Sequence, residues 1–537
     1  MRYLDKIFNL RKTSQTQALP NRPEQVINSA GGYVWEAGLW KRLERFLILG
    51  SEAGTYYANE TALTVENAAA VQACLKADGL RVLNAVVDVS AAARAPKNDP
   101  ALFVLAMAAS PAFADARTNA AALAALALVA RNASHLCTFA CMVEGLRGWG
   151  RGLRSAVADW YLNKPVKELA FQMLKYKNRM GWSHRDLLRL SHPKAATPEQ
   201  NALFRWAIDS EIGDLAPEEL KQVYGFELAK RATAEAEIVR LIEDYRLTHE
   251  MIPSRWKKSA TVWNALVADM PYDALVRHLG KLTALGVIAP DGETTGLIVA
   301  RLIDRWRIQR SRVHPIALLG ARLVYGQGRG ERGSLRWTPA AAILDALDEA
   351  FYVAFANVDA TERRIYLAID ASGSMQNSVC QGLPFVSSAM GAAAMAMVFA
   401  RSEPNYTISA FHDRIRQIAI GPEDGLEAAC AAIAHEPRAT DASLPFEDAL
   451  ARGLEVDAFV LITDSETWGG PQHPVQALER YRKESGIVAK LVVIAMAANR
   501  FTIADPNDAL QMDVVGFDAA VPAVVAGFIR DPVDTTN

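Results

Sequence analysis

The sequence lacks long apolar runs and an export signal. No stretch of about 18 consecutive uncharged apolar residues, the length that crosses a bilayer, occurs among the 537 residues. The first residues, MRYLDKIFNLRKTSQTQ, contain neither the apolar stretch nor the cleavage site of a secretory signal. We therefore expect a cytoplasmic protein without a membrane partner.

Cysteine is scarce. The chain has five cysteines, an odd number, and no Cys-x-x-Cys pair. This spacing excludes a disulfide framework and fits reduced thiols in a cytosol. Cys137 and Cys141 lie one helical turn apart, but no second pair of ligands accompanies them, so buried packing is favoured over metal binding.

Several catalytic signatures are also missing. The sequence contains no GxxxxGK[ST] loop, no HExxH zinc motif and no GxSxG nucleophile elbow. A dehalogenase-type phosphatase needs a second aspartate two residues after the first, and Ser372 stands there after Asp370. We expect a protein that is not an enzyme.

Charge is divided unevenly along the chain, which is too long for one core. Residues 359–537 contain 13 Lys+Arg and 24 Asp+Glu, which leaves 45 basic (58 − 13) and 36 acidic (60 − 24) residues before them. The first part is therefore near +9 and the last part near −11. We predict two domains, 1–358 and 359–537, of which the first handles an anion.

The first part reads as almost wholly helical from residue 23 to 350. Apolar residues recur at three- and four-residue intervals, as in TNAAALAALALVARNASHLCTFACMVEGLRGWG, residues 118–150. Each predicted pair of helices takes roughly 40 residues, a spacing typical of a helical-repeat solenoid. An irregular all-helical domain is the alternative.

Short apolar strands alternate with helices after residue 360. This rhythm predicts a parallel, doubly wound α/β sheet, in which ligands bind beyond the carboxyl ends of the strands. The predicted strands are 365–369, 406–411, 458–463, 489–496 and 513–517, and the predicted helices are 380–401, 423–434, 445–454 and 473–485.

Two of these strands run into an acid. Asp370 ends the first strand in AIDASGSM, and Asp464 follows the strand 458–463, so both carboxylates lie at one edge of the sheet. Ser372 and Ser374 follow Asp370 in a tight loop that Gly373 permits. Carboxylate and hydroxyl oxygens gathered in this way suit a divalent cation, most simply Mg²⁺.

The stretch resembles the metal-ion-dependent adhesion site of von Willebrand factor A domains, which begins D-x-S-x-S. That resemblance adds a threonine from a middle loop, Thr440, and implies the ligand set Asp370, Ser372, Ser374, Thr440 and Asp464. The family usually has glycine just before the threonine, where this chain has Ala439. A capping and turn cluster without metal is the alternative.

The segment 164–194 is the richest in basic residues, with eight Lys+Arg against Glu168 and Asp186. On a helix, Lys175 and Arg179 fall opposite the apolar positions and face solvent together. A second helix starts at Ser183, whose capping box is completed by Asp186, and His192 comes at its end. A solvated charged face is the alternative.

A second basic stretch, 301–332, contains eight arginines and only two acids, Asp304 and Glu331. Arginine can make bidentate contacts to phosphate and can stack on bases.

Four motifs occur in the order found in the Ro autoantigen, or TROVE, family, which the chain resembles from about residue 23 to its end. They are the D-x-S-x-S domain and AGGYVWEAGLWKRLERFLILGSEAGTYY (30–57), LKYKNRMGWSHRDLLRLSHPK (174–194) and RVHPIALLGARLVYGQGRG (312–330). The alanine-rich composition is typical of a bacterial member.

The resemblance implies a ring of HEAT-like helical repeats closed by a von Willebrand A domain. It implies binding of small non-coding Y RNA on the outer surface through Lys175, Arg179 and His192, and of single-stranded ends of misfolded RNA in a central hole. It also implies a monomer without RNA that works with a 3′-exoribonuclease, such as polynucleotide phosphorylase, in RNA decay and stress survival.

Three functions are compatible with the residues. One is a non-catalytic RNA-binding scaffold for quality control, which the basic segments favour. Another is an adaptor whose A-domain metal binds an acidic residue of a partner protein. The third is a metal-dependent nuclease, which is disfavoured because a single oxygen-ligand site has no second cluster of acids beside it.

Overall fold

The chain forms two compact units, one made of residues 1–70, 312–320 and 351–537 and the other of residues 71–311 and 321–350. The computed structural model describes residues 12–20, 22, 24–36, 38–49, 65, 68–91, 95, 98–210, 218–290, 292–311, 313, 315–330, 334–357, 359–377, 386–464, 467–496, 501–515 and 521–530. The boundaries of these compact units differ from the predicted domain bounds, 1–358 and 359–537, which stay a prediction. We call the two units the α/β unit and the helical unit.

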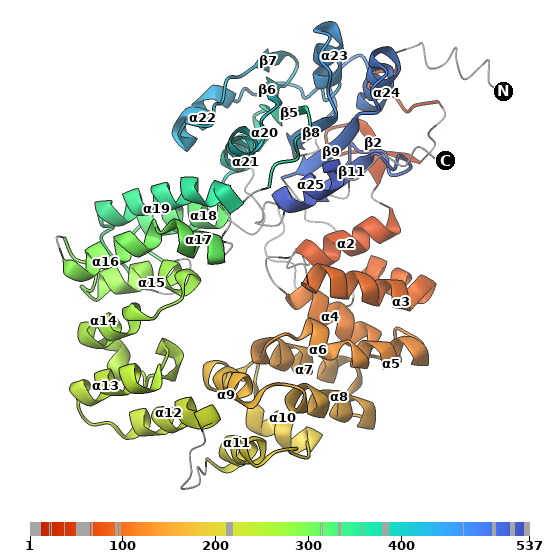
Figure 1. Ribbon diagram of the computed structural model, residues 1–537. Coiled ribbons are helices and arrows are strands. Elements are labelled where there is room, and N and C mark those ends of the chain that lie inside the picture. The colour runs from red at the N-terminus through yellow and green to blue at the C-terminus, as the bar shows by residue number, and fades with distance from the viewer. Residues whose placement is uncertain are drawn as a thin grey trace. The chain divides into compact units, whose positions relative to one another are not determined.

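The helical unit is a succession of short helices, most of which pack on helices close to them along the chain (Figure 1). Its elements are α3 (Ala69–Ala91), α4 (Asp99–Ala108), α5 (Ala116–Ala124), α6 (Leu126–Val129), α7 (Ala133–Arg147), α8 (Arg151–Leu162), α9 (Val166–Lys175), β3 (Asn178–Arg179), β4 (Trp182–Ser183), α10 (His184–Ser191), α11 (Pro198–Asp209), η1 (Glu218–Leu220), α12 (Lys221–Arg231), α13 (Glu235–Tyr245), η2 (His249–Met251), η3 (Trp256–Lys258), α14 (Ala260–Ala268), α15 (Tyr272–Ala284), α16 (Glu293–Leu302) and α17 (Arg305–Ser311). Two further helices, α18 (Pro315–Gly326) and α19 (Ala341–Val353), have residues in both units. Packing between elements that are close in the sequence is characteristic of helical-repeat proteins.

Polar caps explain where several of these helices begin. Asp115, Asn132 and Thr197 precede α5, α7 and α11, and each side chain accepts a hydrogen bond from a backbone N–H of the first turn. Across the described residues, no helix is both long and apolar enough to cross a membrane.

The α/β unit is built on a six-stranded sheet in the order β11–β9–β8–β5–β6–β7, in which only β7 is antiparallel to its neighbour. Its elements are β1 (Gln25–Ile27), β2 (Tyr33–Glu36), α2 (Leu39–Leu49), η4 (Ala354–Asn357), β5 (Ile365–Asp370), α20 (Ser374–Asn377), α21 (Ser388–Ser402), β6 (Tyr406–Phe411), β7 (Ile415–Gln417), α22 (Leu426–Ile433), α23 (Leu444–Ala451), β8 (Ala458–Thr463), α24 (Pro474–Ser485), β9 (Lys490–Ala495), β10 (Phe501–Thr502), β11 (Gln511–Val515) and α25 (Val521–Arg530). The predicted fold class, a helical-repeat part and a doubly wound α/β part, is confirmed.

The strand order fixes where a ligand site can form. After β5 the chain adds β6 and β7 on one side and then crosses to add β8, β9 and β11 on the other. The order therefore reverses between β5 and β8, and loops at the carboxyl ends of these two strands diverge to leave a crevice. Every residue of β5, β8 and β9 is buried, as expected for central parallel strands covered on both faces.

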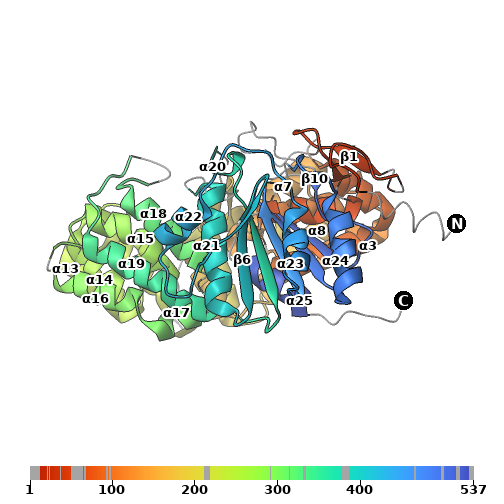
Figure 2. The ribbon, with the colours of Figure 1, turned by 90° about the horizontal axis from the view of Figure 1, so that it is seen from above.

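Helices cover both faces of this sheet. Tyr366 on β5 and Phe459 on β8 pack in one core with Phe446 of α23 and Tyr481 of α24. Helix α21 lies alongside β6 (Figure 2), and almost all of its small side chains are buried. The predicted helix 380–401 therefore begins at Ser388, and part of the preceding segment lies outside the described residues.

The prediction of helix from residue 23 onward is wrong for the first segment. Residues 25–27 and 33–36 form antiparallel strands β1 and β2, and β10 pairs with β2. Val34 and Trp35 are buried there although the strands are only three and four residues long. The pairing of β2 with β10, far away in the sequence, stabilises an extended conformation that no local pattern signalled.

Candidate metal centre and nucleic-acid interface

The two predicted metal-binding acids lie at the switch point of the sheet. Asp370 is the last residue of β5, and Asp464 directly follows β8, the strand paired with β5. Both residues are buried, with exposed fractions of 0% and 4%. The strands therefore deliver two carboxylates to one dry edge of the sheet, as predicted from the sequence.

The first serine of the motif, Ser372, contacts the Asp370 carboxylate, and Ser374 contacts Ser372. The Ser372 backbone N–H donates to Asp370 Oδ1 at 2.9 Å, and the Ser372 and Ser374 hydroxyl oxygens lie 3.0 Å apart. Thr463, which the sequence analysis did not include, donates from its hydroxyl to Asp370 Oδ2 at 2.7 Å. These neutral donors hold the carboxylate in place without neutralising its charge.

Thr440 lies in a buried loop tied to the segment that follows Asp464. Its carbonyl oxygen accepts hydrogen bonds from Gly469 N at 2.8 Å, from Trp468 N at 3.2 Å and from the Thr467 hydroxyl at 3.1 Å. The next residue, Asp441, donates its N–H to the carbonyl oxygen of His412, which follows β6. The middle loop is thus anchored at the carboxyl edge of the sheet beside the two acids.

The N-terminal segment holds the loop after Asp464 from the other side. Asn28 Nδ2 donates to Thr467 O at 2.7 Å, and the Thr467 hydroxyl also lies 3.2 Å from Gln15 Oε1. The backbone of Gly32 passes so close that a Cβ there would lie 2.1 Å from Thr467 O. Sequence reasoning missed this support, because nothing local links residues 15–32 to residue 467.

The electrostatics of this edge suit a divalent cation. Burial, and then the neighbouring charge of Asp464, raise the pKa of Asp370 well above its usual range. A cation between the two carboxylates would relieve that repulsion, with Ser372, Ser374 and Thr440 supplying neutral oxygens. Within the described residues, no three or more His, Cys, Asp or Glu side chains are grouped as metal ligands, so any site here depends on hydroxyl groups.

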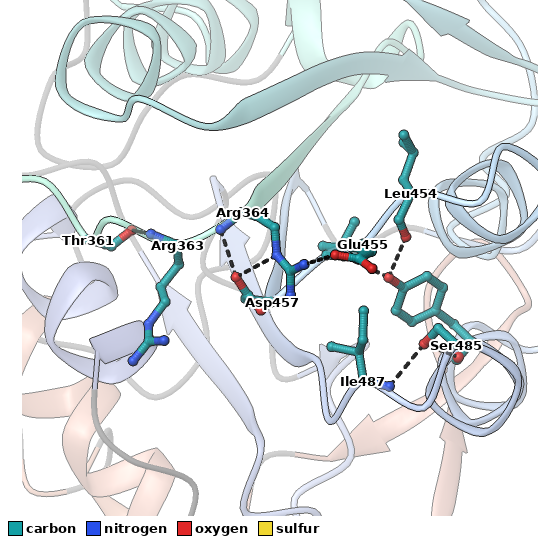
Figure 3. Close-up of polar contacts among 10 residues, drawn as sticks. Thr361, Arg363, Arg364, Leu454, Glu455, Asp457, Ser485 and Ile487 are labelled. Atoms are coloured by element: carbon teal, nitrogen blue, oxygen red, sulfur yellow. Dashed lines mark hydrogen bonds and ion pairs between the residues drawn. The ribbon is translucent and has the colours of Figure 1, made fainter.

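At the opposite edge of the same strands, a carboxylate is paired with an arginine (Figure 3). Arg364, just before β5, donates to Asp457, just before β8, from Nε at 3.0 Å and from Nη2 at 2.7 Å. Hydrogen bonding from Arg364 lowers the pKa of Asp457. Asp370 has no such arginine bond among the described contacts, and that contrast supports a functional use of its edge.

Of the predicted RNA-binding residues, Lys175 is the last residue of α9 and is half-buried. Its Nζ lies 3.9 Å from Glu250 Oε1 and close to the rings of Phe171 and Tyr176. The side chain is therefore attracted toward η2, where Glu250 lies.

The predicted helix through Arg179 is wrong. Helix α9 ends at Lys175, and Arg179 lies in a two-residue strand that pairs with Trp182 across a turn formed by Met180 and Gly181. Both turn residues have positive φ, 52° and 82°, which is the geometry of a tight hairpin. Arg179 is exposed on this hairpin, which contacts α7 and α10.

His192 ends α10, as predicted. The capping box of Ser183 and Asp186 is present at the start of this helix, and His192 is its C-cap with φ 47° and an exposed side chain. Helix α10 and the hairpin are packed together, so both His192 and Arg179 are presented from ordered backbone. The order comes from the cap and the turn, although the predicted continuous helix is absent.

The structure adds three lysines that sequence reasoning did not select. Lys177 Nζ and Lys230 Nζ lie 3.9 and 5.2 Å from the centre of the Phe226 ring. Desolvation, followed by the charges of Lys257 and Lys230, lowers the pKa of Lys177 to about 8. Glu227 pairs with Lys230 at 2.7 Å, and an anion such as phosphate would further stabilise these crowded cations. Lys177 follows α9, Lys230 lies on α12 and Lys257 lies on η3, so sequence spacing gave no signal.

A cavity of about 600 Å³ borders the hairpin. Its lining combines polar and apolar side chains, namely Cys141, Glu144, Met180, Gly181, Trp182, Asp186, Arg189 and Leu190. Trp182 packs on Trp149 with ring centres 5.2 Å apart. Cys141 thus lines a surface hollow, whereas Cys137 on the same helix is buried as predicted.

The fold and these residues define a class of protein that combines a helical-repeat unit with a von Willebrand A-type α/β unit. A family model described as the TROVE domain matches residues 26–245 and 240–324, and one described as the Ro60 vWA domain matches residues 364–529. The chain belongs to the Ro60, or TROVE, family.

Full-length relatives agree with this assignment. The chain is 39% identical to "RNA-binding protein RO60" of Deinococcus radiodurans over 535 residues, which covers 99% of this chain and all of that protein. It is 32% identical to "RNA-binding protein RO60" of Caenorhabditis elegans over 586 residues, or 95% of this chain and 90% of the relative. The crystal structure of the Deinococcus radiodurans RO (RSR) protein has a TM-score of 0.76 at 38% identity and covers 92% of this chain and 99% of that one.

Proposed function

We propose that this protein is a non-catalytic RNA-binding scaffold. It binds small structured non-coding RNA of the Y RNA type through Lys175, Arg179 and His192, and it takes single-stranded ends of misfolded or damaged RNA at other basic surfaces. It acts in the cytoplasm, as a monomer until RNA binds, and presents RNA to a 3′-exoribonuclease such as polynucleotide phosphorylase in decay and stress survival.

The exposed hairpin carries this proposal. Arg179 projects from a tight turn whose flanking residues pack on α7 and α10, so its guanidinium is available for phosphate without unfolding any element. His192 is exposed at the C-terminal end of α10, the helix that directly follows the hairpin. The relatives' name, RNA-binding protein, agrees with this reading.

The test is a gel-shift series over salt with a Lys175→Ala/Arg179→Ala/His192→Ala variant. Affinity for structured small RNA should fall, and the log–log salt slope should flatten by roughly one unit for each lost phosphate contact. Because Lys175 is half-buried beside Glu250, an Arg179→Ala/His192→Ala variant separates binding from folding.

A matched control removes two exposed arginines elsewhere in the helical unit, Arg117 on α5 and Arg240 on α13. Its affinity should stay near that of the unchanged protein. If the hairpin variant binds structured RNA as tightly as the control, the proposed surface is only a solvated face. Shortening of the RNA in Mg²⁺ by purified protein would instead support the nuclease reading.

A second function is proposed for the α/β unit, namely adhesion through a divalent cation held by Asp370, Ser372, Ser374, Thr440 and Asp464. The two buried carboxylates at the switch point support it. A cation there could bind an acidic side chain of a partner protein. Asp370→Asn should then abolish partner capture in Mg²⁺ while leaving RNA affinity unchanged.

A further inference from the structure

Helix α17 displays a tryptophan that its own unit leaves largely uncovered. Trp306 keeps 60% of its surface exposed, whereas Trp160 and Trp263 in the same unit are buried at 1% and 2%. Exposing a large aromatic ring to water is unfavourable unless a partner covers it in function. The ring is therefore a candidate contact residue.

The helix presents this ring in a fixed direction. Ile308 is fully buried and anchors the opposite side of α17, since residues two apart on a helix point about 200° apart. Asp304 fixes the start of the helix by accepting a hydrogen bond from Arg307 N at 3.1 Å. One turn after Trp306, the Arg310 guanidinium lies 5.0 Å from the centre of the ring. The aromatic face and a cation thus form one surface.

The charge around the ring is positive. Arg305, Arg307 and Arg310 are exposed, and the only acid beside them in the sequence, Asp304, accepts from Arg307 Nε at 3.2 Å. Ion pairs from Arg305 or Arg310 are not found among the described residues. Arg301 is different, because it is buried and donates to the carbonyl oxygen of Ala268.

We propose that Trp306, flanked by Arg305 and Arg310, stacks on an unpaired base of single-stranded RNA while the arginines contact the adjacent phosphates. The inference rests on the proposed RNA-binding function and names a residue for its single-stranded part. An exposed indole stacks on any base, but only on a base whose face is not already occupied within a duplex. The excess of arginine fits a polyanion.

The experiment compares Trp306→Ala with Trp306→Phe in the full chain. The probes are a single-stranded oligonucleotide, the same backbone with a run of abasic sites, and a structured small RNA. Trp306→Ala should weaken binding of the base-bearing oligonucleotide about tenfold, and Trp306→Phe should restore most of it. Affinity for the abasic and structured probes should not change. Melting temperature should also be unchanged, since the ring is exposed.

The control is Leu297→Ala, which removes an apolar side chain that is 48% exposed on α16. Equal binding of the base-bearing oligonucleotide by Trp306→Ala and the unchanged protein would overturn stacking, as would an equal loss on the abasic probe. If Trp306→Ala abolishes binding of an acidic peptide but leaves binding of single-stranded RNA unchanged, the surface binds protein and the stacking proposal is overturned. Failure of the unchanged protein to bind any single strand overturns the inference, whereas retained binding of structured RNA would leave the hairpin proposal standing.

Discussion

Replacing Asp370 with asparagine tests the metal centre most directly. The amide keeps the shape of the carboxylate, and its oxygen can still accept from Ser372 N, so the loop should fold. The change removes one of two buried charges, which are 0% and 4% exposed. Without metal the variant should be as stable as the unchanged protein or more stable, because Asp464 no longer faces a second carboxylate.

With metal the order should reverse. A cation present at about 100 times its dissociation constant stabilises the folded state by about 2.7 kcal/mol. For a unit of this size each kcal/mol raises the melting temperature by about 2–4 °C, so saturating Mg²⁺ should raise it by about 5–11 °C. The variant should show almost none of this shift.

The assay is differential scanning calorimetry of the full chain with Mg²⁺ or with EDTA, reading the transition of the α/β unit. The matched control is Asp448→Asn, which removes a carboxylate that accepts from Tyr366 Oη in the same unit. This control should lower stability equally with and without metal. An equal Mg²⁺ shift in Asp370→Asn and the unchanged protein would refute the assignment of the ligands.

Three further outcomes follow from the geometry. The affinity of the unchanged protein for single-stranded RNA should fall by up to about tenfold between pH 7 and 9, because the pKa of about 8 leaves Lys177 charged below that pH and neutral above it. Lys177→Arg should abolish this fall, measured with an oligonucleotide of A and C only. A flat profile for the unchanged protein would contradict this. Gly32→Ala should destabilise the α/β unit by about 1–3 kcal/mol in denaturant unfolding, because its Cβ would lie 2.1 Å from a backbone oxygen, whereas Gly38→Ala, with nothing within 4 Å, should not. Asp457→Asn should cost about 1 kcal/mol near neutral pH, since the Arg364 pair is partly exposed. Because the pKa of Asp457 is lowered in the folded state, that difference should start to shrink as the pH falls below about 4 and vanish below the folded-state pKa, and a constant difference would exclude the ion pair as its cause.

The local sequence determined the strands of the six-stranded sheet, with the exception of β7. Alternating apolar strands and amphipathic helices are set by side-chain periodicity, and the strand predicted at 458–463 has the same bounds as β8. An acid after a buried strand and a Ser-Gly-Ser turn also defined the candidate metal edge, because carboxyl ends of parallel strands meet at one edge. The capping box at Ser183 and Asp186 was likewise readable from residue types at fixed spacing.

Only tertiary structure decided the rest. Periodicity extended α9 through Arg179, but the Met180-Gly181 turn and packing on α7 favour a hairpin over one more helical turn. Strand β2 is stabilised by pairing with β10 from more than 450 residues away, and β1 pairs in turn with β2. Pairing of this kind depends on contacts between distant segments, so the sequence specifies it only through the completed fold. The grouping of Lys177 with Lys230 around Phe226 has the same origin.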